Sequence, residues 1–106
     1  MALAPNTVAD AALETAARLR ETAEVSRTQA ELTRKRAAAT RAIAAAERAE
    51  ASVTPLLTHA GPRQHHARLL EEEARLHEVE AEVLDREADR LFSQALTAEL
   101  RAKAVS

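Results

Sequence analysis

The chain has 106 residues, of which 30% are charged and only 1% are aromatic, and its net charge is −2. It contains no Cys, so the fold needs no disulfide, and no apolar run approaches the ~18 residues of a membrane span. Acidic and basic residues are interspersed, which argues against the one-sided basic surplus of a dedicated nucleic-acid-binding protein.

The first predicted element is a long helix. We expect residues 1–6 to form a flexible tail and residues 7–106 to form a single domain. Residues 7–53 contain neither Gly nor Pro and are rich in Ala, Leu, Arg and Glu, the strongest helix formers. A helix of this length without an internal break is typical of a coiled coil.

A turn is predicted next, at residues 54–62. This stretch holds the only Gly and two of the three Pro of the chain, and both residue types interrupt helices. A second helix is then expected over residues 63–104. The predicted fold is therefore all-α: an antiparallel two-helix coiled-coil hairpin. One kinked helix that pairs with a second chain remains the alternative.

Both predicted helices carry alanine at every seventh position. These residues, called the alanine ladders below, are Ala9, Ala16, Ala23, Ala30, Ala37, Ala44 and Ala51, followed by Ala67, Ala74, Ala81, Ala88, Ala95 and Ala102. A strict seven-residue repeat places its members on one stripe of a helix. Small side chains along that stripe let two helices approach closely, so we expect the ladders to form the seam of the hairpin.

Three residues after each ladder position lies a second set of seam positions. In the second helix these include Leu70, Leu84 and Leu91, and Ala with Leu makes a usable coiled-coil core. His77 is the polar member of this set. Imidazole changes charge between pH 5 and 8, so burial of His77 predicts a pH-sensitive seam.

Larger apolar residues also lie away from the seam, and we predict that they form interaction surfaces. The predicted interaction residues are Val25, Leu32, Leu69, Leu76, Val83, Phe92 and Leu96. One hairpin partner cannot cover two apolar stripes on each helix. We therefore expect either self-association, as a homodimer that forms a four-helix bundle, or a complex with another helical protein. The alternative is that these residues lie on a solvated helix face and contact no partner.

The order of the charges also favours an antiparallel hairpin. With a turn near Thr58, the basic run Arg34–Arg36 and Arg41 lie opposite the acidic run of residues 71–87. Glu47 and Glu50 lie opposite Arg63, Arg68 and the histidine pair of residues 65–66, and Arg18 and Arg20 lie near Glu99. Opposite charges that face each other set the register of two helices more than they add stability.

No constellation of residues predicts catalysis. Metal sites need several convergent ligands, and the nearest pair among the four histidines is Glu73 with His77. We expect no metal and no cofactor. The glutamates of residues 71–82 point in all directions around a helix and predict a solvated face rather than paired catalytic carboxylates. The basic run Arg34–Arg36 leaves nucleic-acid binding as an alternative to ion pairs within the hairpin.

The shape of a Cys-free helical hairpin of about a hundred residues resembles the small proteins exported by type VII secretion systems. Those proteins carry a Trp-x-Gly turn, where this chain has His59-Ala60-Gly61 and no Trp. The charged hairpin is also similar to the stalk proteins of flagellar and type III export gates. These resemblances imply a secretion-associated hairpin as a second functional class.

The predicted function is non-catalytic, as an interaction, adaptor or structural subunit that acts through exposed apolar helix faces. Residues 1–5 lack the basic and apolar segments of a signal peptide. We therefore expect a cytoplasmic protein, although export that needs no signal peptide leaves no such mark.

Overall fold

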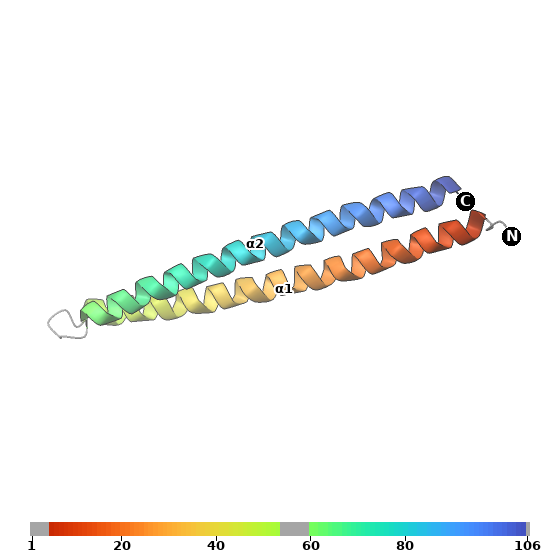
Figure 1. The fold of residues 1–106 in the computed structure, drawn as a ribbon. Helices are drawn as coiled ribbons and strands as arrows, with labels where there is room; N and C mark the ends of the chain where they lie inside the picture. The colour runs from red at the N-terminus through yellow and green to blue at the C-terminus, as the bar shows by residue number, and fades with distance from the viewer. Residues whose placement is uncertain (1–4, 54–59, 106) are drawn as a thin grey trace. The chain divides into compact units, whose positions relative to one another are not determined.

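The computed structural model describes residues 5–53 and 60–105, and all of them lie in two helices (Figure 1). Helix α1 spans Pro5–Val53 and helix α2 spans Ala60–Val105. The helices run antiparallel, because residues early in α1 pair with residues late in α2: Arg20 with Glu99, and Arg48 with Glu71. The predicted all-α hairpin is confirmed, and a single kinked helix is excluded.

The helix boundaries differ slightly from those predicted. α1 begins at Pro5 and α2 at Ala60, so Gly61 and Pro62 belong to the first turn of α2. Proline fits the first turn of a helix because the backbone N–H that it lacks has no partner there. Gly61 has no positive φ and takes an ordinary helical conformation. The rest of the predicted turn, residues 54–59, and residues 1–4 of the predicted tail lie outside the described residues.

The chain divides into two compact units. The first unit consists of residues 5–29 of α1 and residues 83–105 of α2. The second unit consists of residues 30–53 of α1 and residues 60–82 of α2. Each unit is thus a pair of antiparallel helical segments, and its core is the seam between them.

The alanine ladders form the seam in both units. Every ladder residue is buried, and Ala9, the most exposed, retains 6% of its surface. Among the described residues, Leu91 is the only buried hydrophobic residue larger than alanine. Leu19 and Phe92 pack against the cluster that Leu91 forms with Ala23 and Ala88. The core of the hairpin is therefore very thin.

The second set of seam positions is less deeply buried than the ladders, and most of its members, such as Leu70 and Leu84, are half-buried. Two polar residues of α1 in this set are buried. Ser26 and Thr33 are 7% and 6% exposed. The Ser26 hydroxyl donates a hydrogen bond to the Leu84 carbonyl oxygen at 2.7 Å. This contact satisfies the buried hydroxyl with an acceptor on the opposite helix. His77 occupies the predicted seam position and is half-buried, with 26% of its side chain exposed.

Candidate interaction surface

Six of the seven predicted interaction residues project from the surface. Each retains more than half of its accessible area: Val25, Leu32, Leu69, Leu76, Val83 and Leu96. The hairpin itself therefore does not cover them. Leu32, Leu69 and Leu76 belong to the second unit, and the other three belong to the first.

Phe92, the seventh, is half-buried and takes part in the hairpin. The guanidinium carbons of Arg20 and Arg27 lie 5.9 and 4.9 Å from the centroid of its ring. These distances are typical of cation–π contacts. Arg27 also pairs with Asp89 at 2.7 Å, so both the ring and its arginines have partners within the first unit.

Sequence reasoning missed several exposed apolar residues. The structure adds large side chains that are 43–53% exposed: Val8, Leu13, Ile43 and Val79. Val8 and Ile43 each directly precede a ladder alanine. Numbering each position relative to the ladders would have identified them, because the ladders fix which side of each helix faces its neighbour.

The charge register predicted from the sequence is largely confirmed in both units. Arg41 pairs with Glu78 at 2.7 Å, His66 lies 3.5 Å from Glu47, and Arg63 pairs with Glu50. Arg20 pairs with Glu99 as expected, whereas Arg18 pairs with Glu14 on its own helix. These contacts identify which residues lie on the same side of each unit.

The second unit has two distinct sides. Arg41–Glu78 and Arg48–Glu71 bridge the helices on one of them, called the arginine side below. Glu47–His66 and Glu50–Arg63 bridge the helices on the other, called the histidine side.

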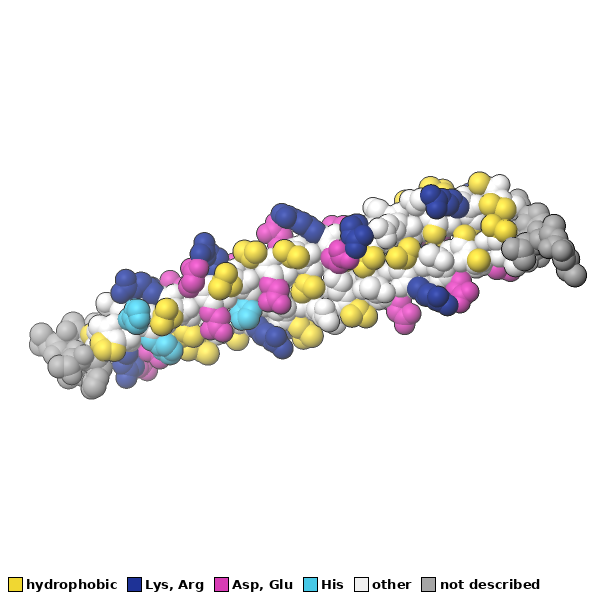
Figure 2. Space-filling model, in the orientation of Figure 1, with side chains coloured by type: hydrophobic (Ala, Val, Ile, Leu, Met, Phe, Trp, Pro, Cys, Tyr) yellow, Lys and Arg dark blue, Asp and Glu magenta, His cyan; other side chains and the backbone are white. Residues whose placement is uncertain are grey.

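Three exposed apolar residues of the second unit, Leu69, Leu76 and Ile43, lie on the histidine side. Residues three, four or seven positions apart share a side of a helix. Leu69 follows His66 by three positions and Leu76 follows Leu69 by seven, while Ile43 precedes Glu47 by four. Figure 2 shows a face on which hydrophobic, acidic and histidine side chains are mixed.

Ion pairs on the arginine side lower the pKa of the glutamates that form them. The hydrogen bond from Arg48 is the main cause of the lowered pKa of Glu71, and the hydrogen bond from Arg41 lowers the pKa of Glu78 in the same way. The charges of the same arginines add to the effect. Both carboxylates are therefore held in the ionised form that the pairs need.

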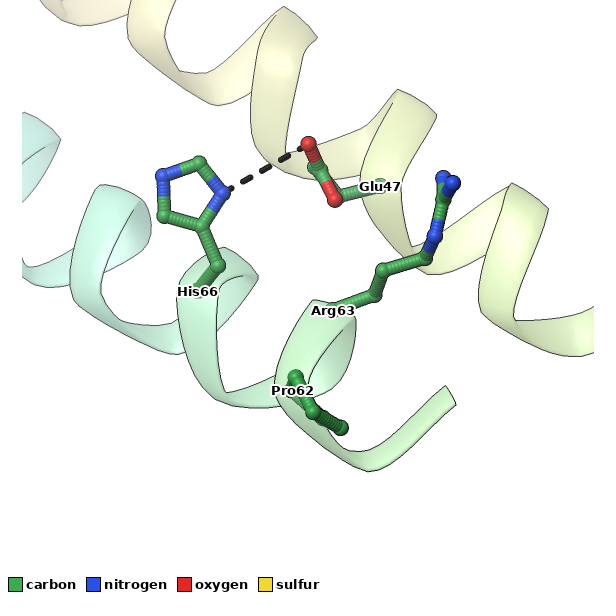
Figure 3. A pocket seen from close by; sticks show the side chains of 4 residues that line it. All are labelled: Glu47, Pro62, Arg63 and His66. Carbon is green, nitrogen blue, oxygen red and sulfur yellow. Dashed lines mark ion pairs between the residues drawn. The ribbon is translucent and has the colours of Figure 1, made fainter. Parts of the chain in front are cut away.

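A shallow pocket of about 460 Å³ lies on the histidine side near the start of α2 (Figure 3). It is lined by Glu47, Pro62, Arg63 and His66, and the His66 ring faces the Glu47 carboxylate. Among the described residues, the titratable groups that line it are Glu47, Arg63 and His66, which pair with one another or with Glu50. The described residues that line the pocket include no hydroxyl or thiol beside the imidazole, so they provide no nucleophile–base pair.

His77 and part of the basic run contact other side chains of the hairpin. Glu73 and Glu80 each lie 3.7 Å from a different ring nitrogen of His77. Across residues 5–53 and 60–105, no three His, Asp or Glu side chains gather as a metal site would require. Within the basic run Arg34 has an interaction partner, and Arg41, five residues after the run, pairs with Glu78 on the other helix.

Neither described helix is long and apolar enough to cross a membrane. Comparison of the chain with protein families, with characterised proteins and with solved structures finds no match. The candidate surface is therefore defined by its own geometry: small residues fill the seam, and large apolar residues face outward.

Proposed function

We propose that this protein is a non-catalytic interaction subunit, with an adaptor or structural role, that binds a helical protein partner through its exposed apolar helix faces. One observation carries the proposal. The seam buries alanine almost exclusively, while thirteen large hydrophobic residues of the described helices are 39–77% exposed. Burial of large apolar side chains is the main source of stability in folding and association. A chain that buries its small residues and exposes its large ones leaves most of that free energy for a partner.

The distribution of the large residues supports the same proposal. They line both helices over their whole described lengths, from Val8 on α1 to Val105 on α2. Amphipathic helices recognise partners through apolar residues spaced three, four or seven positions apart, and Leu69, Leu76 and Val83 follow one another at intervals of seven. The partner class that fits is another helix or helical hairpin.

The test is a double substitution, Leu76→Asp with Val83→Asp. Both residues are more than half exposed, so the hairpin should keep its helicity, measured by circular dichroism, while association is lost. Association is read by light scattering of the purified protein and by co-purification from its native source. Ser93→Asp with Gln94→Asp adds the same charge at exposed positions of α2 and should leave association intact. Association that survives the Leu76/Val83 change would contradict the proposal.

A further inference from the structure

We propose that the histidine side of the second unit binds the same side of a second copy of this chain. In this pairing α1 of each copy packs antiparallel against α2 of the other. The inference rests on the proposed function and adds the identity and the register of the partner. It is carried by the way the two helices complement each other in side-chain size and in charge.

The α2 strip on this side is large and acidic. It consists of Leu69, Glu73, Leu76 and Glu80, whose spacing of four, three and four positions keeps them on one side of the helix. Both leucines are more than half exposed, at 57% and 60%. Glu73 and Glu80 are exposed as well.

The α1 strip on this side carries basic residues and, at two positions, alanines. Leu32, Arg36, Ala39 and Ile43 have the same spacing, with Lys35 beside them and Ala46 continuing the strip. Ala39 and Ala46 are exposed and leave space above α1. Within residues 5–53 and 60–105, neither Lys35 nor Arg36 forms an ion pair.

The contacts between the helices fix the levels of the two strips. In an antiparallel pair, the contact Arg41–Glu78 places Ala39 level with Glu80, and the contact Glu47–His66 places it level with Ala74. The mean of the two sides puts Ala39 within one residue of the level of Leu76, and Ala46 within one residue of the level of Leu69. By the same register, Lys35 and Arg36 lie level with Glu80.

A two-fold axis parallel to the helices brings the α1 strip of one copy over the α2 strip of the other at the same level. Leu76 and Leu69 then enter the spaces above Ala39 and Ala46. Lys35 and Arg36 meet Glu80 of the second copy, and Glu73 extends the acidic strip. A two-fold interface uses each contact twice, so a side that carries both complementary strips is self-complementary. Another protein would need to supply both strips in the same order.

The test exchanges the charges of the two strips. Lys35→Glu with Arg36→Glu makes both strips acidic, and Glu73→Lys with Glu80→Lys makes both strips basic. Each variant alone should weaken self-association by about tenfold or more, because like charges then face each other twice. An equimolar mixture should recover a heterodimer of about wild-type affinity, since each interface then again pairs an acidic strip with a basic one. Analytical ultracentrifugation measures the dissociation constants.

Glu21→Lys with Glu24→Lys is the matched control. It makes the same change in charge as Glu73→Lys with Glu80→Lys, but at exposed positions of α1 in the first unit. It should leave the dimer unchanged. Circular dichroism checks the helicity of each variant, and recovery in the mixture shows that neither variant has lost its fold.

Two results would overturn the inference and leave the proposed function standing. One is a wild-type protein that stays monomeric up to about 1 mM while Leu76→Asp with Val83→Asp still blocks capture of another protein. The other is a wild-type dimer that both charge variants preserve, because the copies would then meet through a different face. Loss of all association in the wild type and at its source would instead contradict the proposed function itself.

Discussion

At the scale of single residues, the seam has room only for small side chains. Ala37 is 2% exposed, and its neighbour Ala38 is exposed. The same contrast holds for Ala44 and Ala45. Close approach of two helices depends on the absence of side-chain atoms beyond Cβ at the buried positions. The buried and the exposed alanine of each pair are adjacent in the sequence, so the same substitution can be compared inside and outside the seam.

Replacing Ala37 by Leu should destabilise the protein by about 1–3 kcal/mol, because the added atoms must force the helices apart or adopt strained rotamers. Ala38→Leu, which adds the same atoms on the outside, should change the free energy of unfolding by less than about 0.5 kcal/mol. Urea denaturation of both variants at one protein concentration measures the difference. Equal stability of the two variants would show that the seam is not closely packed.

At the scale of the helices, ion pairs set which residues of α1 lie beside which residues of α2. Arg41 and Arg48 each reach a glutamate on α2 from positions seven residues apart. Glu71 and Arg75 lie four positions apart on α2 but do not pair with each other, because Glu71 pairs with Arg48 and Arg75 pairs with Glu72. Contacts between the helices therefore replace a local pair that the sequence spacing allowed.

The Arg41–Glu78 pair predicts a specific pH dependence. The pKa of Glu78 is lowered from 4.5, so its contribution to stability is complete above that value and is lost as pH falls through the lowered pKa. At pH 7, Glu78→Gln should melt a few degrees below the wild type, and the gap should close as the pH is lowered below 4.5.

Thermal melts followed by circular dichroism across this range measure the gap. Glu24→Gln removes an exposed charge that has no ion-pair partner among the described residues, so its melting temperature should track the wild type at every pH. A gap for Glu78→Gln that is constant with pH would mean that ionisation of Glu78 does not stabilise the hairpin.

At the scale of the whole molecule, the two units differ in what they bury. The first unit buries Leu91 and packs Leu19 and Phe92 against it. In the described part of the second unit, every buried hydrophobic residue is an alanine. Alanine offers little apolar area, so the second unit gains less from its own core and more from whatever covers its histidine side.

Hydrogen exchange should reveal this difference. In dilute protein, backbone amides of residues 30–53 and 60–82 should exchange faster than those of residues 5–29 and 83–105, because the thinner core opens at lower free energy. Raising the protein concentration should slow exchange in the second unit more than in the first if a second copy covers it. Mass spectrometry of exchanged peptides measures both. Uniform protection of the two units at low concentration would contradict the difference in their cores.

The sequence by itself determined the helices, the hairpin and the seam. Local propensity set the helices, and the seven-residue repeat selected the buried stripe down to each ladder residue. Charge order correctly placed Arg20 near Glu99 and Arg41 opposite the acidic run that contains Glu78, because the register of two long helices follows from the position of one turn. Gly61 and Pro62, however, were predicted in the turn and lie in the first turn of α2, since a helix start tolerates both residue types.

Only the tertiary structure decided the roles of individual side chains. It assigned Phe92 to the hairpin, where Arg20 and Arg27 cover its ring, although the sequence placed it among the outward residues. It also put Leu69, Leu76 and Ile43 on one side of the second unit. Whether a side chain lies inside or outside depends on the angle at which two helices face each other, and contacts between residues distant in sequence set that angle.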